Sequence, residues 1–130
     1  MKVRIVAVLA IAILSAAAVA GCSTQARAER KGKAAGDQIC KAKNANNAND
    51  AQREINQANN KLNDLARFTG RDVREDVRDL DRNLNQVARG NASEQDINAI
   101  VRSIEDARRS ATGNALAAYD GMLEALANCD

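Results

Sequence analysis

The sequence predicts an all-α fold, a small antiparallel bundle of three to four coiled-coil-like helices, and three observations favour it. The chain contains no proline, and alanine, asparagine and arginine are common whereas valine, isoleucine and threonine are few. That composition favours helices over strands. Apolar residues recur every three or four positions from residue 48 onward, which is the period of one helix face. Glycine or a capping serine stands where the periodic runs stop or start.

The first of these helices is expected to begin or bend within residues 43–50, to carry its apolar stripe from Ala48 and to end at Thr69. Residues 43–50 are rich in asparagine, and asparagine side chains compete with the helix backbone for hydrogen bonds. Gly70 supplies the C-terminal stop. The apolar stripe is narrow and rich in alanine, and it consists of Ala48, Ala51, Ile55, Ala58, Leu62 and Leu65.

The second helix is expected at about residues 71–89, and the third begins after Ser93. Gly90 ends the second helix, and residues 91–92 form a tight turn. Ser93 and Asp96 have the spacing of a capping box. The stripe of the second helix is Val73, Val77, Leu80, Leu84 and Val87, and that of the third is Ile97, Ile100, Ile104, Ala107 and Ala111.

The N-terminal segment has the features of a secretory signal peptide. Met1 to Arg4 carries two positive charges, and residues 5–20 are apolar apart from Ser15. This apolar run is too short to indicate a membrane span, and it ends in small residues, as a signal peptidase site does. Residues 1–21 are therefore predicted to be removed.

The residues Val19-Ala20-Gly21-Cys22 resemble the lipobox of bacterial lipoproteins. In that class the cysteine thiol receives a diacylglycerol, the signal is cut before the cysteine, and the new amine is usually acylated. The resemblance covers residues 1–22 only. It implies lipidation at Cys22 and an exported protein of the bacterial cell envelope, lipid-anchored to the cell membrane or the outer membrane. It assigns no catalytic residue to the rest of the chain.

Removal of the signal changes the charge balance. Lys2 and Arg4 leave with it, so that seventeen basic residues face seventeen acidic ones. A neutral chain gives no reason to expect a nucleic-acid partner. The remaining residues, about 109 in number, suffice for one small domain. We divide them into a flexible, lipidated tether at residues 22–36 and a helical bundle domain at residues 37–130.

Cys40 and Cys129 lie near opposite ends of the expected bundle domain. The lipobox accounts for Cys22, and thiols of exported proteins are oxidised to disulfides outside the cytosol. We therefore expect a Cys40–Cys129 disulfide. Two buried free thiols are the alternative. Closing a loop of about ninety residues would stabilise the fold by about 4 kcal/mol. Two cysteines without a histidine do not predict a metal site.

The number of helices depends on residues 112–114, Thr-Gly-Asn. If the chain reverses there, a fourth helix returns Cys129 to the end of the bundle where Cys40 lies, because antiparallel helices alternate in direction. If the third helix continues through Gly113, Cys129 ends far from Cys40 and both thiols stay free. The disulfide therefore favours four segments. The stripe of the fourth is Ala115, Tyr119, Met122 and Leu126, and its larger members are expected to be core residues rather than parts of a ligand pocket.

Basic residues follow the predicted anchor closely. They are Arg27, Arg30, Lys31 and Lys33. Beside a lipid anchor, each such residue can contribute about 1 kcal/mol of attraction to an anionic membrane surface. A solvated linker with no such role is equally consistent with the pattern.

The chain lacks the residue types on which much catalysis depends. It has no histidine, which removes the commonest general base and every Ser-His or Cys-His arrangement. Carboxylates at residues 72–81 alternate with arginines, and pairs such as Arg71–Glu75 and Asp79–Arg82 have helical neighbour spacing. This pattern predicts an exposed face with ion pairs. We expect no enzyme activity, no cofactor and no metal.

Two classes of function fit these observations. The first is a non-enzymatic, membrane-anchored module that acts by contact with another envelope component or by self-association. Lipoproteins of phages and prophages that block superinfection are similar in size and anchoring alone. The second is a binding module that holds a small apolar or lipid-like ligand between its helices.

Overall fold

The computed structural model describes residues 19–90 and 92–129, with side chains from residue 24 onward, and all regular structure in these ranges is helical. In chain order the helices are α2 (Val19–Lys43), α3 (Ala48–Thr69), α4 (Val73–Asp76), α5 (Leu80–Ala88), α6 (Glu94–Arg108) and α7 (Gly113–Ala127). The predicted all-α bundle is confirmed. Residues 1–18 of the predicted signal peptide lie outside the described residues.

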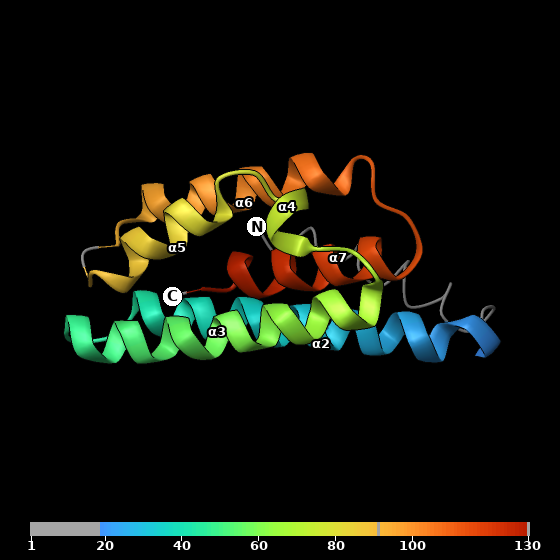
Figure 1. Cartoon of the computed structure of the whole chain (residues 1–130), viewed down its shortest axis with the longest axis horizontal. Coiled ribbons are helices and arrows are strands. Elements are labelled where there is room, and N and C mark those ends of the chain that lie inside the picture. Colours follow the sequence, from blue (N-terminus) through green and yellow to red (C-terminus); the bar gives the residue numbers. More distant parts are fainter. Residues whose placement is uncertain (1–18, 91, 130) are drawn as a thin grey trace.

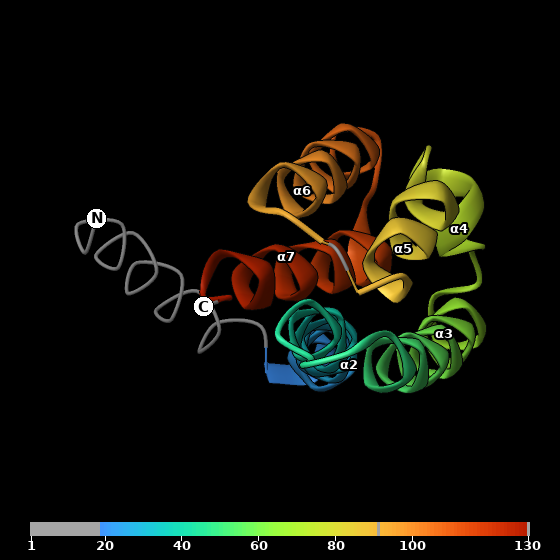
Figure 2. The same cartoon turned by 90° about the vertical axis from the view of Figure 1, so that its left-hand side faces the viewer.

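The helices form five rows, with α4 and α5 sharing one, and consecutive rows run in opposite directions (Figure 1). Each row packs against the next: α2 contacts α3, α3 contacts α5, α5 contacts α6, and α6 contacts α7. Because α7 also packs against α2, the rows close into a ring (Figure 2). Each of the five rows reverses the direction of the row before it. The first and the fifth, α2 and α7, therefore run parallel. Their contact is the most extensive between any two described helices.

Helix α2 corrects the prediction of a flexible tether at residues 22–36, which is wrong: these residues are helical and belong to the bundle. An added Cβ at Gly32 would overlap the carbonyl oxygen of Ala118, and one at Gly36 would lie 2.8 Å from the Cβ of Ala125. Gly32 and Gly36 are thus the positions where α7 packs closely on α2. The remaining buried apolar residues of α2 are Ala28, Ala35, Ile39, Cys40 and Ala42.

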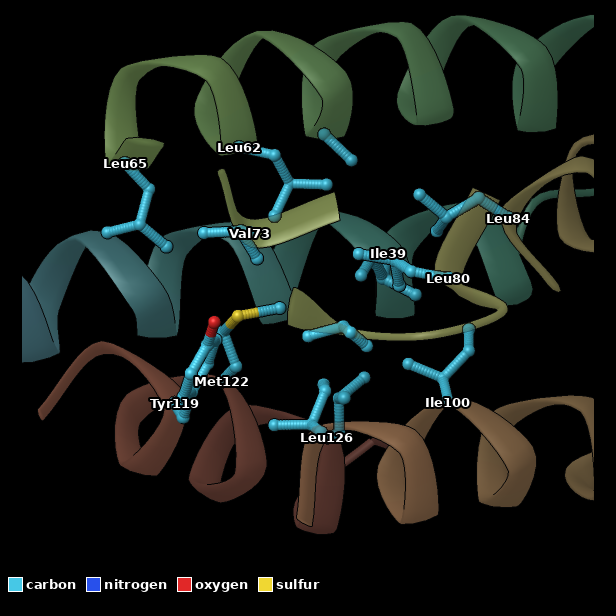
Figure 3. Packing of buried hydrophobic residues seen from close by; sticks show 14 of the residues in the cluster. Ile39, Leu62, Leu65, Val73, Leu80, Leu84, Ile100, Tyr119, Met122 and Leu126 are labelled. Carbon is cyan, nitrogen blue, oxygen red and sulfur yellow. The ribbon is translucent and has the colours of Figure 1, made fainter. Parts of the chain in front are cut away.

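The predicted apolar stripes form the core. Every stripe residue of the four expected segments is buried except Ala48, at the start of α3. Figure 3 shows these side chains converging with Ile39 of α2 between the helices. The labelled residues from the predicted stripes are Leu62, Leu65, Val73, Leu80, Leu84, Ile100, Tyr119, Met122 and Leu126. The helical period therefore identified the inward faces of α3, α5, α6 and α7.

The second predicted helix, at residues 71–89, is divided into α4 and α5, and with α2 this raises the count above the predicted three to four. Between the two, Val77 has an extended backbone with φ −97°, and Asp79 is left-handed with φ 66°. Aspartate is among the few residues other than glycine that adopt this conformation regularly. The bend keeps Val77 and Leu80 fully buried.

The predicted helix ends agree with the structure in three places. Gly70 is left-handed and ends α3, and the Ser93–Asp96 capping box begins α6. The chain also breaks between α6 and α7, so the alternative with a reversal at residues 112–114 is confirmed. That reversal determines where the last helix places Cys129.

Candidate functional site

The basic residues that follow Cys22 are arranged by helix α2. Arg27, Arg30 and Lys31 are three and four positions apart, so that they share one face of the helix. Cys22, the predicted lipidation site, falls near the start of α2, and its side chain lies outside those described. With a rise of 1.5 Å per residue, Arg27 follows Cys22 by about 8 Å along the helix.

A groove of about 350 Å³ lies between this face of α2 and the C-terminal half of α3. We call it the basic groove, and its lining residues are Arg27, Arg30, Lys31, Ala34, Lys61 and Asp64. The antiparallel register of the two helices creates it. Lys31 meets Asp64, and Arg27, one turn earlier, meets Phe68, one turn later. The facing surfaces of α2 and α3 are thus joined by these pairs.

Two kinds of contact hold Arg27 and Lys31 in the groove. Lys31 Nζ donates a hydrogen bond of 2.7 Å to the Asp64 carboxylate. The Phe68 ring lies under two of the three α2 cations, with its centroid 5.5 Å from Lys31 Nζ and 5.7 Å from the Arg27 guanidinium carbon. Both distances allow cation–π attraction. The hydrogen bond from Lys31, with smaller contributions from Arg67 and Lys61, lowers the pKa of Asp64.

Lys33 belongs to a different surface from the other predicted basic residues. It lies toward α7, where its Nζ is 3.5 Å from the Glu124 carboxylate. Glu29, one turn earlier on α2, has a pKa raised by burial and then by the charges of Glu124 and Asp120. Lys33 therefore balances a group of carboxylates and does not line the basic groove.

Lys61 is the groove cation that the sequence did not predict as part of the site. It comes from α3, three residues before Asp64 and seven before Phe68, so the three share one face of that helix. This spacing is visible in the sequence. The spacing alone does not show that this face of α3 lies against residues 27–34 of α2.

Cys40 and Cys129 meet near the end of α2 that is remote from Cys22. Their sulfur atoms are 2.15 Å apart, their Cα atoms are 5.4 Å apart, and 89 positions separate them in the sequence. Cys129 reaches Cys40 because α7 reverses the direction of α6. The structure thus agrees with the expected disulfide and with the chain reversal that the disulfide favoured.

Tyr119 is a core residue, as expected, and it also carries a buried polar contact. The residue is 1% exposed, and its hydroxyl donates a hydrogen bond of 2.8 Å to Asp76 of α4. Arg71 Nε lies 2.9 Å from the same carboxylate. Burial, and then the hydrogen bond to Asp76, raise the pKa of Tyr119 far above its ordinary value of 10.0. This network ties α7 to the segment that begins after α3.

We expect Tyr119 to remain protonated in the folded chain above pH 10. Its raised pKa means that the folded state keeps a proton that the unfolded state releases, so its contribution to stability is complete below pH 10 and is lost as the pH rises. Tyr119 is the one tyrosine of the chain, and tyrosinate absorbance therefore reports it alone. Replacing Tyr119 by phenylalanine should flatten the alkaline fall in the free energy of unfolding. A native chain that ionises as an exposed tyrosine does would contradict the network.

The predicted ion-paired face at residues 71–82 is present with one change of partner. Asp79 and Arg82 pair at 3.5 Å, as the spacing indicated. Arg71 is bonded to Asp76 rather than to the predicted Glu75. Arg71 precedes α4, so helical spacing does not govern its partner. Within residues 19–90 and 92–129, no three metal-ligating side chains gather into a site.

Comparison with known proteins identifies no relative. No family description, no curated protein and no solved structure matches the chain. Among the helices that the structure describes, none has both the length and the apolar character needed to cross a bilayer. The function is therefore argued from the residues of this chain alone.

Proposed function

We propose that the chain is a bacterial cell-envelope lipoprotein, exported, cleaved before Cys22 and held on a membrane by lipid attached to that cysteine. The observation that carries the proposal is the sequence V-A-G-C at residues 19–22, preceded by a basic start and an apolar segment. The Cys40–Cys129 pair supports it, because structural disulfides persist in oxidising compartments outside the cytosol. The cations on α2 support it too, because basic residues near an anchor strengthen membrane attachment.

We further propose that the bundle acts by contact with another envelope component or with a second copy of itself, without catalysis. Support comes from the residues that could otherwise do chemistry. The sequence has no histidine, and its one phenol, that of Tyr119, is buried and hydrogen-bonded to Asp76. Two of its three cysteines are joined to each other.

The anchoring proposal is tested by the intact mass of the protein purified from its own membranes. We expect a chain that begins at Cys22 and carries diacylglycerol and an acyl group. Reduction should add the mass of two hydrogen atoms as the Cys40–Cys129 bond opens. A Cys22→Ala variant should carry no lipid and should show the same change on reduction. An unmodified Cys22 in the native protein would overturn the proposal.

The contact role needs a separate experiment. Cross-linking in intact cells, followed by purification of the acylated protein, should recover one defined partner or a dimer of the chain. The same treatment of an unrelated lipoprotein from these membranes is the control. Recovery of the same bulk lipoproteins from both would remove the support for a specific contact.

A further inference from the structure

We propose that the basic groove between α2 and α3 binds the phosphate group of an anionic lipid headgroup. The inference rests on the proposed lipid anchor, because proximity to Cys22 selects a membrane lipid, rather than a free phosphate, as the source of the ligand. It deepens the proposed function by naming which surface of the bundle meets the membrane and which lipid chemistry that surface recognises.

The charge of the groove suits a phosphate. Its charged lining residues are Arg27, Arg30, Lys31, Lys61 and Asp64, so four cations and one anion leave an excess of three positive charges. Arginine binds phosphate oxygens through two parallel N–H donors, and lysine adds a compact charge with three donors. Lys31, Arg67 and Lys61 together lower the pKa of Asp64, as a locally positive potential would. An anion entering the groove meets that same potential.

The groove is also partly organised before a ligand arrives. Lys31 is held by Asp64 at 2.7 Å, and Phe68 lies under both Lys31 and Arg27. Side chains that are already fixed lose less entropy when a ligand binds. Ala34 contributes a small side chain to the lining, which leaves space between the longer cations. A headgroup phosphate is small enough to enter that space.

The basic groove lies close enough to Cys22 along α2 to reach a lipid of the leaflet that holds the anchor. Arg27, Arg30 and Lys31 follow Cys22 by about 8, 12 and 14 Å along the helix, at 1.5 Å per residue. The headgroup layer of one leaflet is roughly 5–8 Å thick. Charges within about 8–10 Å of a surface still feel its potential at physiological salt. With α2 along the bilayer normal, Arg27 would lie at the outer edge of the headgroups, and a tilt of α2 toward α3 would bring Arg30, Lys31 and Lys61 to the lipid phosphates.

The other lysines of α2 provide internal comparisons. Lys33 lies close to Lys31 in height but faces Glu124 on α7. Lys41 is exposed near the opposite end of the helix. A diffuse attraction between the membrane and the basic helix would affect Lys31 and Lys33 alike. A ligand seated in the groove would cover Lys31 and Lys61 and leave Lys33 and Lys41 as they were.

The test is amine footprinting of the full chain, isolated from its membranes and reconstituted into vesicles. One set of vesicles is phosphatidylcholine alone, and the other contains phosphatidylglycerol as well. A brief pulse of an acetylating reagent is followed by mass spectrometry of each lysine. We expect acetylation of Lys31 and Lys61 to slow several-fold in the anionic vesicles, while Lys33 and Lys41 keep their rates. Equal slowing of all four lysines, or no slowing, would overturn the proposal.

A second arm separates the two sources of phosphate. Inorganic phosphate is added to the phosphatidylcholine sample at matched ionic strength. Protection of Lys61 by phosphatidylglycerol and not by inorganic phosphate supports a headgroup ligand. Protection by inorganic phosphate without any by phosphatidylglycerol would overturn it. Failure of the anchor would show separately, as an unmodified Cys22 in the intact mass, whatever the lysine rates are.

A pair of matched variants tests the contribution of α3. Lys61→Gln removes a cation from the groove, and Lys41→Gln removes one from the same protein outside it. The content of phosphatidylglycerol that half-protects Lys31 should rise about five-fold in Lys61→Gln, the factor expected for one charge near an anionic surface. It should stay unchanged in Lys41→Gln. An equal rise in both variants would show that the protection of Lys31 depends only on net charge, and it would refute phosphate binding in the basic groove.

Discussion

Opening the Cys40–Cys129 bond should lower the free energy of unfolding by about 4 kcal/mol, which is the expectation for a cross-link that closes a very long loop. The two cysteines are 89 positions apart, so the bond restricts most of the unfolded bundle. In the folded chain it joins α2 to the residue that follows α7 and clamps the parallel pair at one end. Urea unfolding with and without a reductant measures the difference.

Two variants define that measurement. A chain with both Cys40→Ala and Cys129→Ala should unfold at the same urea concentration with and without reductant, near that of the reduced wild-type chain. Cys22→Ala should keep the full response to reductant, because its cysteine lies outside the pair. A wild-type chain whose unfolding ignores the reductant would contradict a stabilising bond.

Replacing Gly32 by alanine should destabilise the bundle by about 3 kcal/mol, near the upper end of the usual cost of overpacking a core. Alanine is otherwise the better helix former by about 1 kcal/mol, so the sign of the effect is informative. The new Cβ would overlap the carbonyl oxygen of Ala118 and lie 2.8 Å from its carbonyl carbon. Backbone atoms cannot rotate away, so α2 and α7 would have to separate. Gly121 packs reciprocally against the backbone at Glu29.

Gly70→Ala is the matched control, because a Cβ there meets nothing within 4 Å. Its φ of 74° is left-handed, so alanine at this position should cost about 1–2 kcal/mol through backbone strain alone. Thermal or urea unfolding of both variants separates steric overlap from conformational preference. If Gly32→Ala were the milder change, or a stabilising one, the close approach of α2 and α7 would be refuted.

The helices with large aliphatic stripes could be predicted from the sequence, whereas α2 could not. Large apolar side chains at helical spacing mark a face that must be buried, and this located α3, α5, α6 and α7. The inward face of α2 is made largely of alanine and glycine. Small residues are buried there because another backbone approaches closely, which a single sequence does not reveal. Gly32 and Gly36 therefore resembled the residues of a flexible linker.

The break between α4 and α5 depends on tertiary contacts. No glycine or proline marks residues 77–79, and the apolar period continues through them. The bend is accompanied by the burial of Val77 and by the bond between Asp76 and Tyr119, a residue 43 positions away. Interactions of such long range do not appear in local propensity.

The candidate site was half predictable for a related reason. The α2 cations were identified as a group, but the tether interpretation assigned them no helix faces, and so Lys33 was not separated from Arg27 and Lys31. Lys61 was omitted because its role depends on the register between α2 and α3. Charge composition can indicate a basic surface, while the partner helix decides which cations share it.

The unbroken course of α2 from Val19 to Lys43 gives the proposed anchor a mechanical meaning. A lipid on Cys22 would be attached to a stiff helix that is itself part of the bundle, so no flexible peptide linker would separate the domain from the bilayer. Eighteen residues of helix separate Cys22 from Cys40, a rise of about 27 Å. The helix would therefore set a constant distance between the anchor and the disulfide-linked end of the bundle, as a spacer of set length.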